Sequence, residues 1–260
     1  MDSFALKLVV TPVLIGGASL AGRRWGQGVS GWLVGLPLTS GPVAFFLALE
    51  QGVGFAAAAA VGSLSGAIAE AAFCVGYARL GARHHYLVAT LAGTLAFGAA
   101  SVVLQHVAIA LIWFFLAAVV LLIVSIRLMP QGAPAAAAAP PPRWDIPARI
   151  VVATTLVLGL TAAAPVIGPR WSGLLAAFPV YAAILTIFAH QQQGPGPAIA
   201  VLRGLLVGLF TFAAFFFVLG ATIERFGVTA AFGASIVAAL GLHALSFWTV
   251  LGGRRMPRAA

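Results

Sequence analysis

Residues 30–46 read SGWLVGLPLTSGPVAFF, a hydrophobic stretch whose centre contains two glycines and two prolines, Gly35, Pro37, Gly41 and Pro42. Its composition predicts a transmembrane helix. A proline inside a helix, however, removes a backbone hydrogen bond and clashes with the preceding turn, at a cost of about 3 kcal/mol. Each glycine adds an entropic cost. Such an interrupted helix is expected only where another interaction or a function offsets these costs.

The composition of the whole chain predicts an all-α polytopic membrane protein. Of the 260 residues, 62% are hydrophobic and 7% are charged, whereas about 25% of the residues in a soluble domain are charged. Apolar runs of roughly 20 residues, the length that spans a bilayer, recur along the chain. The net charge of +9 comes mainly from arginines at the ends of these runs. This pattern indicates membrane topology and argues against a nucleic-acid partner.

About nine transmembrane spans are predicted from the apolar runs. The fourth and fifth come from one run, Tyr86–Met129, which is too long for a single spanning helix, and the polar pair Gln105-His106 marks the expected turn. The predicted spans cover residues 4–21, 28–49, 54–78, 86–104, 107–128, 147–167, 171–190, 197–222 and 227–251.

The cations are divided unequally between the two ends of these spans. One side of the membrane holds Arg23, Arg24, Arg79, Arg83, Arg127, Arg143, Arg149, Arg254, Arg255 and Arg258, and the other holds Lys7, Arg170 and Arg225. Because cytoplasmic connections are enriched in Arg and Lys, we expect the amino terminus outside and the carboxyl terminus in the cytoplasm. The expected location is the lipid bilayer of a bacterial cytoplasmic (inner) membrane. The excess of arginine over lysine fits a GC-rich bacterial genome, but no expectation depends on it.

The stretch that opens this section has a counterpart 142 residues further along the chain. Residues 172–188 read SGLLAAFPVYAAILTIF, which places Pro179 over Pro37 and Phe188 over Phe46. The match continues without a gap through Gln51-Gly52 over Gln193-Gly194. Shared prolines, glycines and glutamines do not follow from hydrophobic composition alone, so we infer an internal repeat.

The repeat predicts how the chain is organised. Residues 1–104 form repeat one with four spans, residues 105–129 a connecting span, and residues 130–146 a cytoplasmic linker rich in Pro and Ala. Residues 147–260 form repeat two, also with four spans. An odd number of spans separates the starts of the repeats, so the second enters the membrane from the opposite side. Inverted repeats with paired interrupted helices are typical of secondary transporters.

Both prolines lie about half-way along their predicted spans, near the bilayer centre. Backbone groups freed there cannot face lipid, so we expect them to be buried in protein or to line a cavity. Ser40 is placed as an N-cap, with Pro42 just inside a restarted helix. The positive end of that helix suits an anion or a carboxylate.

The candidate substrate-binding residues follow from the two breaks and from one buried cation. They are Pro37, Thr39, Ser40, Gly41, Pro179, Tyr181 and Arg203, with the repeat-related hydroxyls of Thr39 and Tyr181 as leading contacts. The second break lacks counterparts of Gly41 and Pro42, which favours a kink over an unwound segment and an asymmetric site. The alternative is that both prolines only kink helices for packing, because prolines are common in transmembrane helices.

Glu70 and Arg203 are the ionisable residues placed clearly inside the predicted membrane region, at similar heights on spans three and eight. A charge there is costly and usually has a partner or faces a cavity. Two interpretations remain open. The two side chains form a structural salt bridge, or Glu70 couples transport to protons while Arg203 binds a substrate anion.

The other polar features give weaker indications. Gly62-x-x-x-Gly66 and Gly204-x-x-x-Gly208 predict close helix packing. His243 in span nine could relay protons, although an interhelical hydrogen bond is the favoured interpretation. Cys74 is the single cysteine, and no histidines and carboxylates have the spacing of a metal site. The sequence therefore predicts no disulfide, metal or cofactor.

Together these features predict a secondary transporter and not an enzyme, because one deeply placed carboxylate is too few for paired-carboxylate chemistry. The expected partners are a small, anionic organic solute and protons, moved by alternating access, and a homodimer is left open. The alternatives are a lipid or amphiphile translocase or exporter, and a non-catalytic membrane subunit of a larger complex.

Overall fold

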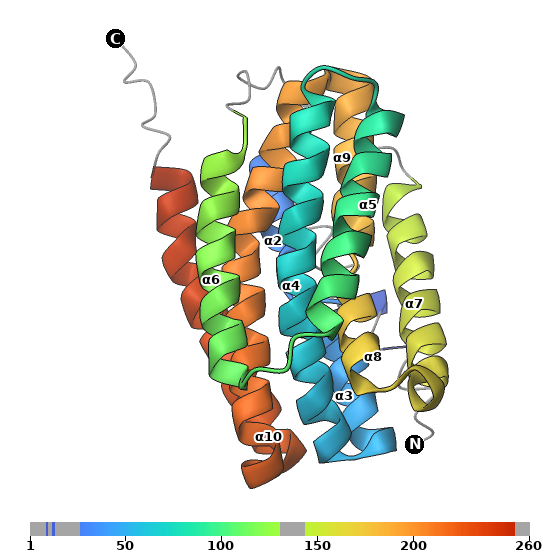
Figure 1. Ribbon diagram of the computed structural model, residues 1–260, viewed down its shortest axis with the longest axis vertical. Helices are drawn as coiled ribbons and strands as arrows, with labels where there is room; N and C mark the ends of the chain where they lie inside the picture. The colour runs from blue at the N-terminus through green and yellow to red at the C-terminus, as the bar shows by residue number, and fades with distance from the viewer. Residues whose placement is uncertain (1–8, 10–11, 14–26, 131–143, 253–260) are drawn as a thin grey trace.

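The computed structural model describes residues 9, 12–13, 27–130 and 144–252, in which all regular secondary structure is helical. Figure 1 shows the helices packed side by side in an elongated bundle. The predicted first span and the predicted linker lie largely outside the described residues. The described helices are α2 (Gln27–Val34), α3 (Ser40–Gln51), α4 (Val53–Gly81), α5 (Tyr86–Gln105), α6 (Leu111–Leu128), α7 (Asp145–Ile167), α8 (Pro169–Ala176), α9 (Val180–Gln193) and α10 (Pro195–Gly252).

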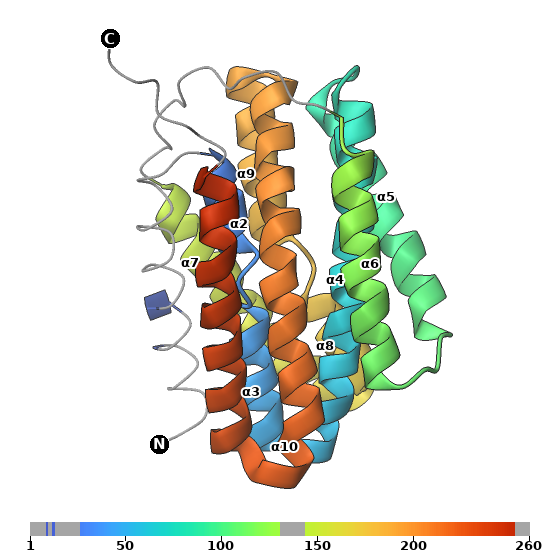
Figure 2. The ribbon, with the colours of Figure 1, turned by 90° about the vertical axis from the view of Figure 1, so that its left-hand side faces the viewer.

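Six helical stretches within the described residues are long and apolar enough to cross a membrane. This confirms the predicted class of an all-α, polytopic membrane protein. The predicted hairpin in the run 86–129 is also confirmed, because α5 ends at Gln105 and α6 begins at Leu111. α10 contains a non-helical residue, Gly227, with φ 76° and ψ 178°. There the chain turns back, so α10 consists of a first arm (195–226) and a second arm (228–252) that lie side by side (Figure 2).

α4 and the first arm of α10 form the centre of the bundle. The largest fully buried side chains include Phe73 and Tyr77 on α4 and Phe216 on α10. α5 and α6 instead carry exposed apolar side chains such as Leu95 and Trp113, as expected for helices whose outer faces meet lipid.

Helix bounds recur in the second half of the chain at the interval of the sequence repeat. α2 and α8 have eight residues each and begin 142 residues apart. α4 and α10 begin at the same interval, each directly after a glycine with a positive φ, Gly52 (φ 90°) and Gly194 (φ 87°). These helices run in opposite directions: in Figure 1, α4 runs from the lower to the upper end of the bundle, and the first arm of α10 runs from the upper to the lower end.

The short helices pack across the two halves of the chain. α2 packs against the first arm of α10, and α8 packs against α4. At each crossing a glycine faces a backbone carbonyl: a Cβ atom on Gly31 would collide with the Val201 oxygen, and one on Gly173 with the Ala59 oxygen. The two crossings therefore use equivalent residues of the sequence repeat.

The predicted packing role of the GxxxG glycines is confirmed for three of them. Gly62 and Gly66 lie against α8, where added Cβ atoms would collide with the Arg170 backbone and the Ala177 side chain. Gly208 lies against α2, at the backbone of Trp32. Small residues at these positions allow the helix backbones to approach closely.

Arginines mark both ends of the bundle. α4 and α6 end at the upper end in Figure 1, with Arg79 and Arg127 in their last turns. Arg170 near the start of α8 and Arg225 beside the turn at Gly227 belong to the opposite end. These four arginines are thus separated in the same way as in the sequence-based topology.

Candidate functional site

The first predicted break is confirmed as an interruption of the helix over residues 35–39, between α2 and α3. The Leu38 amide donates to the Leu36 carbonyl over 2.7 Å, and the Gly41 amide donates to the Pro37 carbonyl over 2.8 Å. Pro42 is the third residue of α3, where the missing amide hydrogen has no intrahelical partner to lose.

The expectation of a mere kink in the second stretch is wrong, because residues 177–179 separate α8 from α9. The Val180 amide donates to the Phe178 carbonyl over 2.8 Å, and the Ala183 amide donates to the Pro179 carbonyl over 2.8 Å. These are the repeat equivalents of the two bonds in the first break. The second break therefore forms without counterparts of Gly41 and Pro42, which lie in the first turn of α3.

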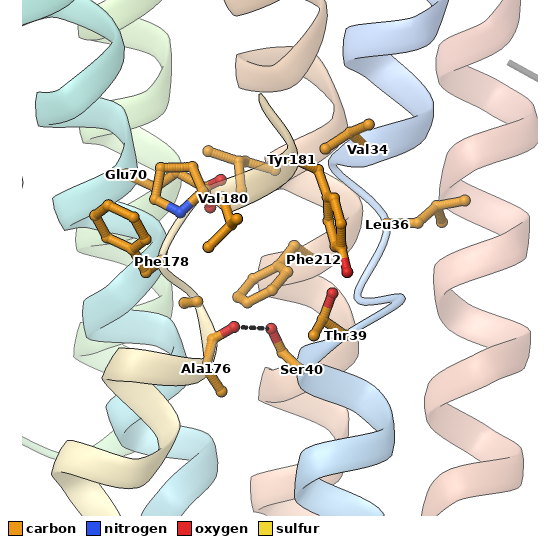
Figure 3. Close-up of a pocket in the computed structure, with 13 residues that line it drawn as sticks. Val34, Leu36, Thr39, Ser40, Glu70, Ala176, Phe178, Val180, Tyr181 and Phe212 are labelled. Atoms are coloured by element: carbon orange, nitrogen blue, oxygen red, sulfur yellow. Dashed lines mark hydrogen bonds between the residues drawn. The ribbon is translucent and has the colours of Figure 1, made fainter. Parts of the chain in front are cut away.

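The prediction that Ser40 caps the restarted helix is wrong by one residue. Thr39 occupies the N-cap position of α3 without a side-chain capping bond. The Ser40 hydroxyl instead donates to the Ala176 carbonyl, the last residue of α8, over 2.7 Å (Figure 3). That carbonyl is one of the acceptors left free where α8 ends, so the hydroxyl joins the two interrupted helices.

A cavity of about 30 Å³ lies between the two breaks, and a site needs roughly 10–15 Å³ to hold one water molecule. Its volume admits about two water molecules and no organic solute. α4 and the first arm of α10 complete its wall. The lining residues are Val34, Leu36, Thr39, Ser40, Glu70, Ala176, Ala177, Phe178, Pro179, Val180, Tyr181, Leu209 and Phe212.

Five of the residues predicted for the site line this cavity, namely Thr39, Ser40, Glu70, Pro179 and Tyr181. The hydroxyl groups of Thr39 and Tyr181, which are equivalent in the repeat, point toward one another (Figure 3). Pro37 and Gly41 belong to the break but not to the cavity wall. A Cβ atom on Gly41 would lie 3.9 Å from Pro37 and 3.8 Å from the Phe215 ring.

Arg203 does not line the cavity. Its guanidinium group donates to the carbonyls of Met129 and Pro130, each over 3.0 Å. These carbonyls follow the end of α6, where helical acceptors are unpaired. No hydrogen bond or ion pair between the described residues joins Arg203 to Glu70, so the structure does not contain the salt bridge considered from the sequence.

Glu70 is the single charged residue in the cavity wall. Its side chain is 5% exposed and extends from α4 toward the second break (Figure 3). The repeat-equivalent residue on α10 is Phe212, which lines the same cavity. The two halves of the chain therefore contribute a carboxyl group and an aromatic ring at equivalent positions, which makes the cavity chemically asymmetric.

Phe178 and Phe212 are cavity residues that the sequence-based reasoning missed. Both could have been found from the repeat, because the 142-residue interval places Phe178 on Leu36 and Phe212 on Glu70. Apolar residues in a hydrophobic chain give no signal of their own, so only their alignment with the first break and with Glu70 distinguishes them.

His243 forms the favoured interhelical contact and lies outside the cavity wall. Its Nδ1 atom lies 3.2 Å from the Thr211 hydroxyl, which belongs to the other arm of α10. Its ring stacks on Trp32 of α2, with 3.6 Å between the ring centroids. The Trp32 indole also donates to Ser246 over 2.8 Å. These contacts attach α2 to both arms of α10.

The two interrupted helices thus meet at a small cavity whose wall contains three hydroxyl groups, two phenylalanine rings and one carboxyl group. No group of three or more His, Cys, Asp or Glu side chains among the described residues could hold a metal ion. In comparisons with known proteins, no protein-family model, no curated protein and no solved structure matches the chain.

Proposed function

We propose that the protein is a secondary transporter that moves a small organic solute by alternating access, with Glu70 as the proton-coupling residue. The observation that carries this proposal is the cavity between two interrupted helices, which encloses a carboxyl group that is 5% exposed. A buried ionisable group is costly in a membrane protein and is characteristic of ion and proton pathways. An interrupted helix supplies backbone groups that a solute can contact.

We propose that the chain consists of two inverted four-span repeats joined by a connecting span, an architecture typical of secondary transporters. Equivalent helices recur 142 residues apart, run in opposite directions and pack across the halves through Gly31 and Gly173. Rocking of one half against the other would open the cavity to either side in turn. Since the present volume of about 30 Å³ is too small for an organic solute, we assign this conformation to a closed stage of the cycle.

The proposed topology has the carboxyl terminus in the cytoplasm and the amino terminus outside, in a bacterial inner membrane. The grouping of Arg79 and Arg127 at one end of the bundle supports this orientation. We propose a non-catalytic role, because the cavity wall contains one carboxyl group and no second carboxyl group or histidine with which it could form a general acid–base pair.

Proton flux across proteoliposomes tests this proposal. The purified protein is reconstituted with an internal pH dye, and libraries of organic amines, acids and lipids are added with a pH gradient in each direction. We expect one solute class to cause saturable proton movement, and Glu70→Gln to reduce that movement to the level of empty liposomes.

Glu224→Gln is the matched control, since Glu224 is exposed near the end of the first arm of α10. Its flux should equal that of the unchanged protein. Solute movement that is saturable and fully retained in Glu70→Gln would show that Glu70 does not couple protons. Movement of lipids alone would favour a lipid translocase, and absence of flux for every solute class would favour a subunit of a larger complex.

A further inference from the structure

The charge of the cavity wall points to the class of solute. Glu70 is its single charged member, and the other polar side chains are the hydroxyl groups of Thr39, Ser40 and Tyr181. The remaining lining residues are apolar or aromatic. An anion in this cavity would lie beside the carboxyl group with no positive side chain to balance either charge, an arrangement that burial makes costly.

Two half-buried arginines, Arg203 and Arg170, are engaged elsewhere. Arg203 donates to the Met129 and Pro130 carbonyls beyond the end of α6. Arg170 donates to the carbonyls of Leu104, in the last turn of α5, and Val107, just after that helix, over 3.2 and 2.7 Å. Positive side chains near helix C-termini are favourable interactions that have to be broken before either arginine can approach the cavity.

The helix termini at the cavity do not favour an anion overall. α3 and α9 begin there and contribute partial positive charges, but α2 and α8 end there and contribute partial negative charges of about the same size. Val34 and Ala176, the last residues of α2 and α8, both line the cavity. Because the partial charges of the four helix ends oppose one another, the carboxyl group of Glu70 determines the sign of the electrostatic potential in the cavity.

The side chains that surround Glu70 do not change the negative potential that its carboxylate gives the cavity. Cys74 lies one turn further along α4. Tyr77, two turns along, is within 3.2 Å of His190 on α9. α10 contributes Leu209 and Phe212 to the wall, and the second break contributes apolar residues followed by Tyr181.

We propose that the cavity binds organic cations that carry an apolar or aromatic group, and that a cation and a proton compete for the Glu70 carboxyl group. The organic cation and the proton each neutralise the buried carboxylate, so binding of one removes the need for the other. The rings of Phe178, Phe212 and Tyr181 lie in the same wall, where aromatic faces attract a cation. This solute class replaces the anion expected from Arg203. Its consequence for transport, exchange of one cation for one proton, rests on the proposed function.

A binding experiment in detergent tests the solute class independently of transport. Three probes of similar size are titrated by calorimetry: benzyltrimethylammonium, 3-phenylpropionate and 3-phenylpropanol. We expect binding of the cation alone. Repeating the titration in buffers of different ionisation enthalpy should show release of about one proton per cation bound at a pH where Glu70 is protonated. Within that range the affinity should rise about tenfold per pH unit, as linkage requires.

Variants at Glu70 separate charge from folding. Glu70→Gln should lower the affinity for the cation at least about tenfold and abolish proton release, and Glu70→Asp should retain proton release. Both variants are compared with Glu224→Gln for their elution as a monodisperse species. Equal or tighter binding of the anion or the alcohol, cation binding without proton release, or failure of all three probes to bind would overturn the proposal.

The same proteins in liposomes distinguish this proposal from the proposed function. Cation binding with proton release but without flux would contradict transport and leave the solute class intact. Glu70-dependent flux of an anion would support transport and overturn the solute class.

Discussion

Gly31 and Gly173 lie where a single methyl group would force two helices apart. A Cβ atom at either position would collide with a backbone carbonyl oxygen, that of Val201 or of Ala59. A backbone atom cannot rotate away as a flexible side chain can, so the helices themselves would have to shift. Gly159 on α7 provides a contrast, because a Cβ atom there meets no atom within 4 Å.

We expect Gly31→Ala and Gly173→Ala each to destabilise the folded protein by about 1–3 kcal/mol, the usual cost of excess volume in a well-packed interior. Thermal unfolding in detergent, followed by intrinsic tryptophan fluorescence, measures this change. Gly159→Ala is the matched control and should leave the melting temperature unchanged or slightly higher. Equal melting temperatures for all three variants would contradict the close approach at both crossings.

The sequence predicts residue types at the site better than it predicts their partners. Thr39, Tyr181 and Glu70 could be placed at the cavity, because prolines and a membrane-embedded charge are visible in the chain. The partners of Arg203 could not, because successive residues on a helix point about 100° apart. Arg203 also precedes Phe212, the α10 residue that shares the cavity with Glu70, by nine residues, and this position places it beside the carbonyls that follow α6.

At the scale of the helices, Ser40 joins the two interrupted elements. Its hydroxyl donates to the Ala176 carbonyl over 2.7 Å, and both groups are buried. A second serine, Ser65, makes a bond of similar length, 3.1 Å, but to Val61 in its own helix. Loss of the first bond leaves a buried acceptor at the end of α8, whereas Val61 keeps its helical hydrogen bond.

Ser40→Ala should therefore destabilise the closed conformation by about 1–2 kcal/mol, since an unpaired buried acceptor carries the full cost of its desolvation. The free energy of unfolding in a detergent-denaturant titration measures this effect. Ser65→Ala is the matched control and should change it by less than about 0.5 kcal/mol. Similar values for the two variants would show that the contact between α3 and α8 does not hold the breaks together.

The positions of the two interruptions were predictable because their cause is local, although the second was expected to be only a kink. Pro37 and Pro179 disrupt the chain within one turn of themselves, and both breaks lie where expected. The role of Ser40 was not predictable in the same way. Its sequence position fits an N-cap, but its actual acceptor, Ala176, comes from an element 136 residues away.

At the scale of the whole molecule, the distribution of arginines between the two ends of the bundle predicts its orientation in the membrane. The α4–α5 connection and the turn at Gly227 lie at opposite ends of the bundle (Figures 1 and 2). Ala82 in the first and Phe226 beside the second are exposed. Cys74 is buried, so a cysteine introduced at either position can be labelled selectively in a Cys74→Ala background.

We expect a membrane-impermeant maleimide to label Phe226→Cys in intact cells and Ala82→Cys only after the membrane is opened. The reason is the excess of arginines at the end of the bundle that contains Ala82. Labelling is read by the mass shift of the purified protein. Labelling of both positions from one side would contradict the spanning arrangement, and a reversed pattern would invert the proposed orientation.

The class of the protein, its hairpins and the interval of its repeat could all be predicted, because hydrophobic run length and glycine and proline positions are properties of the sequence itself. The cavity could not be predicted in the same detail. Its wall combines residues of α2, α3, α4, α8, α9 and α10, and its lining depends on how the two halves cross.

The crossing of α2 with α10 also constrains how the chain can be assembled during synthesis. α2 ends at residue 34, and its partner begins at residue 195, so α2 enters the membrane long before its partner has been made. α8, by contrast, finds α4 already in place. Contacts between such distant segments form slowly. During synthesis, the glycine face of α2 therefore has no α10 to pack against until the two arms of α10 have been inserted. We expect the chain to be most exposed to misfolding and proteolysis during this interval.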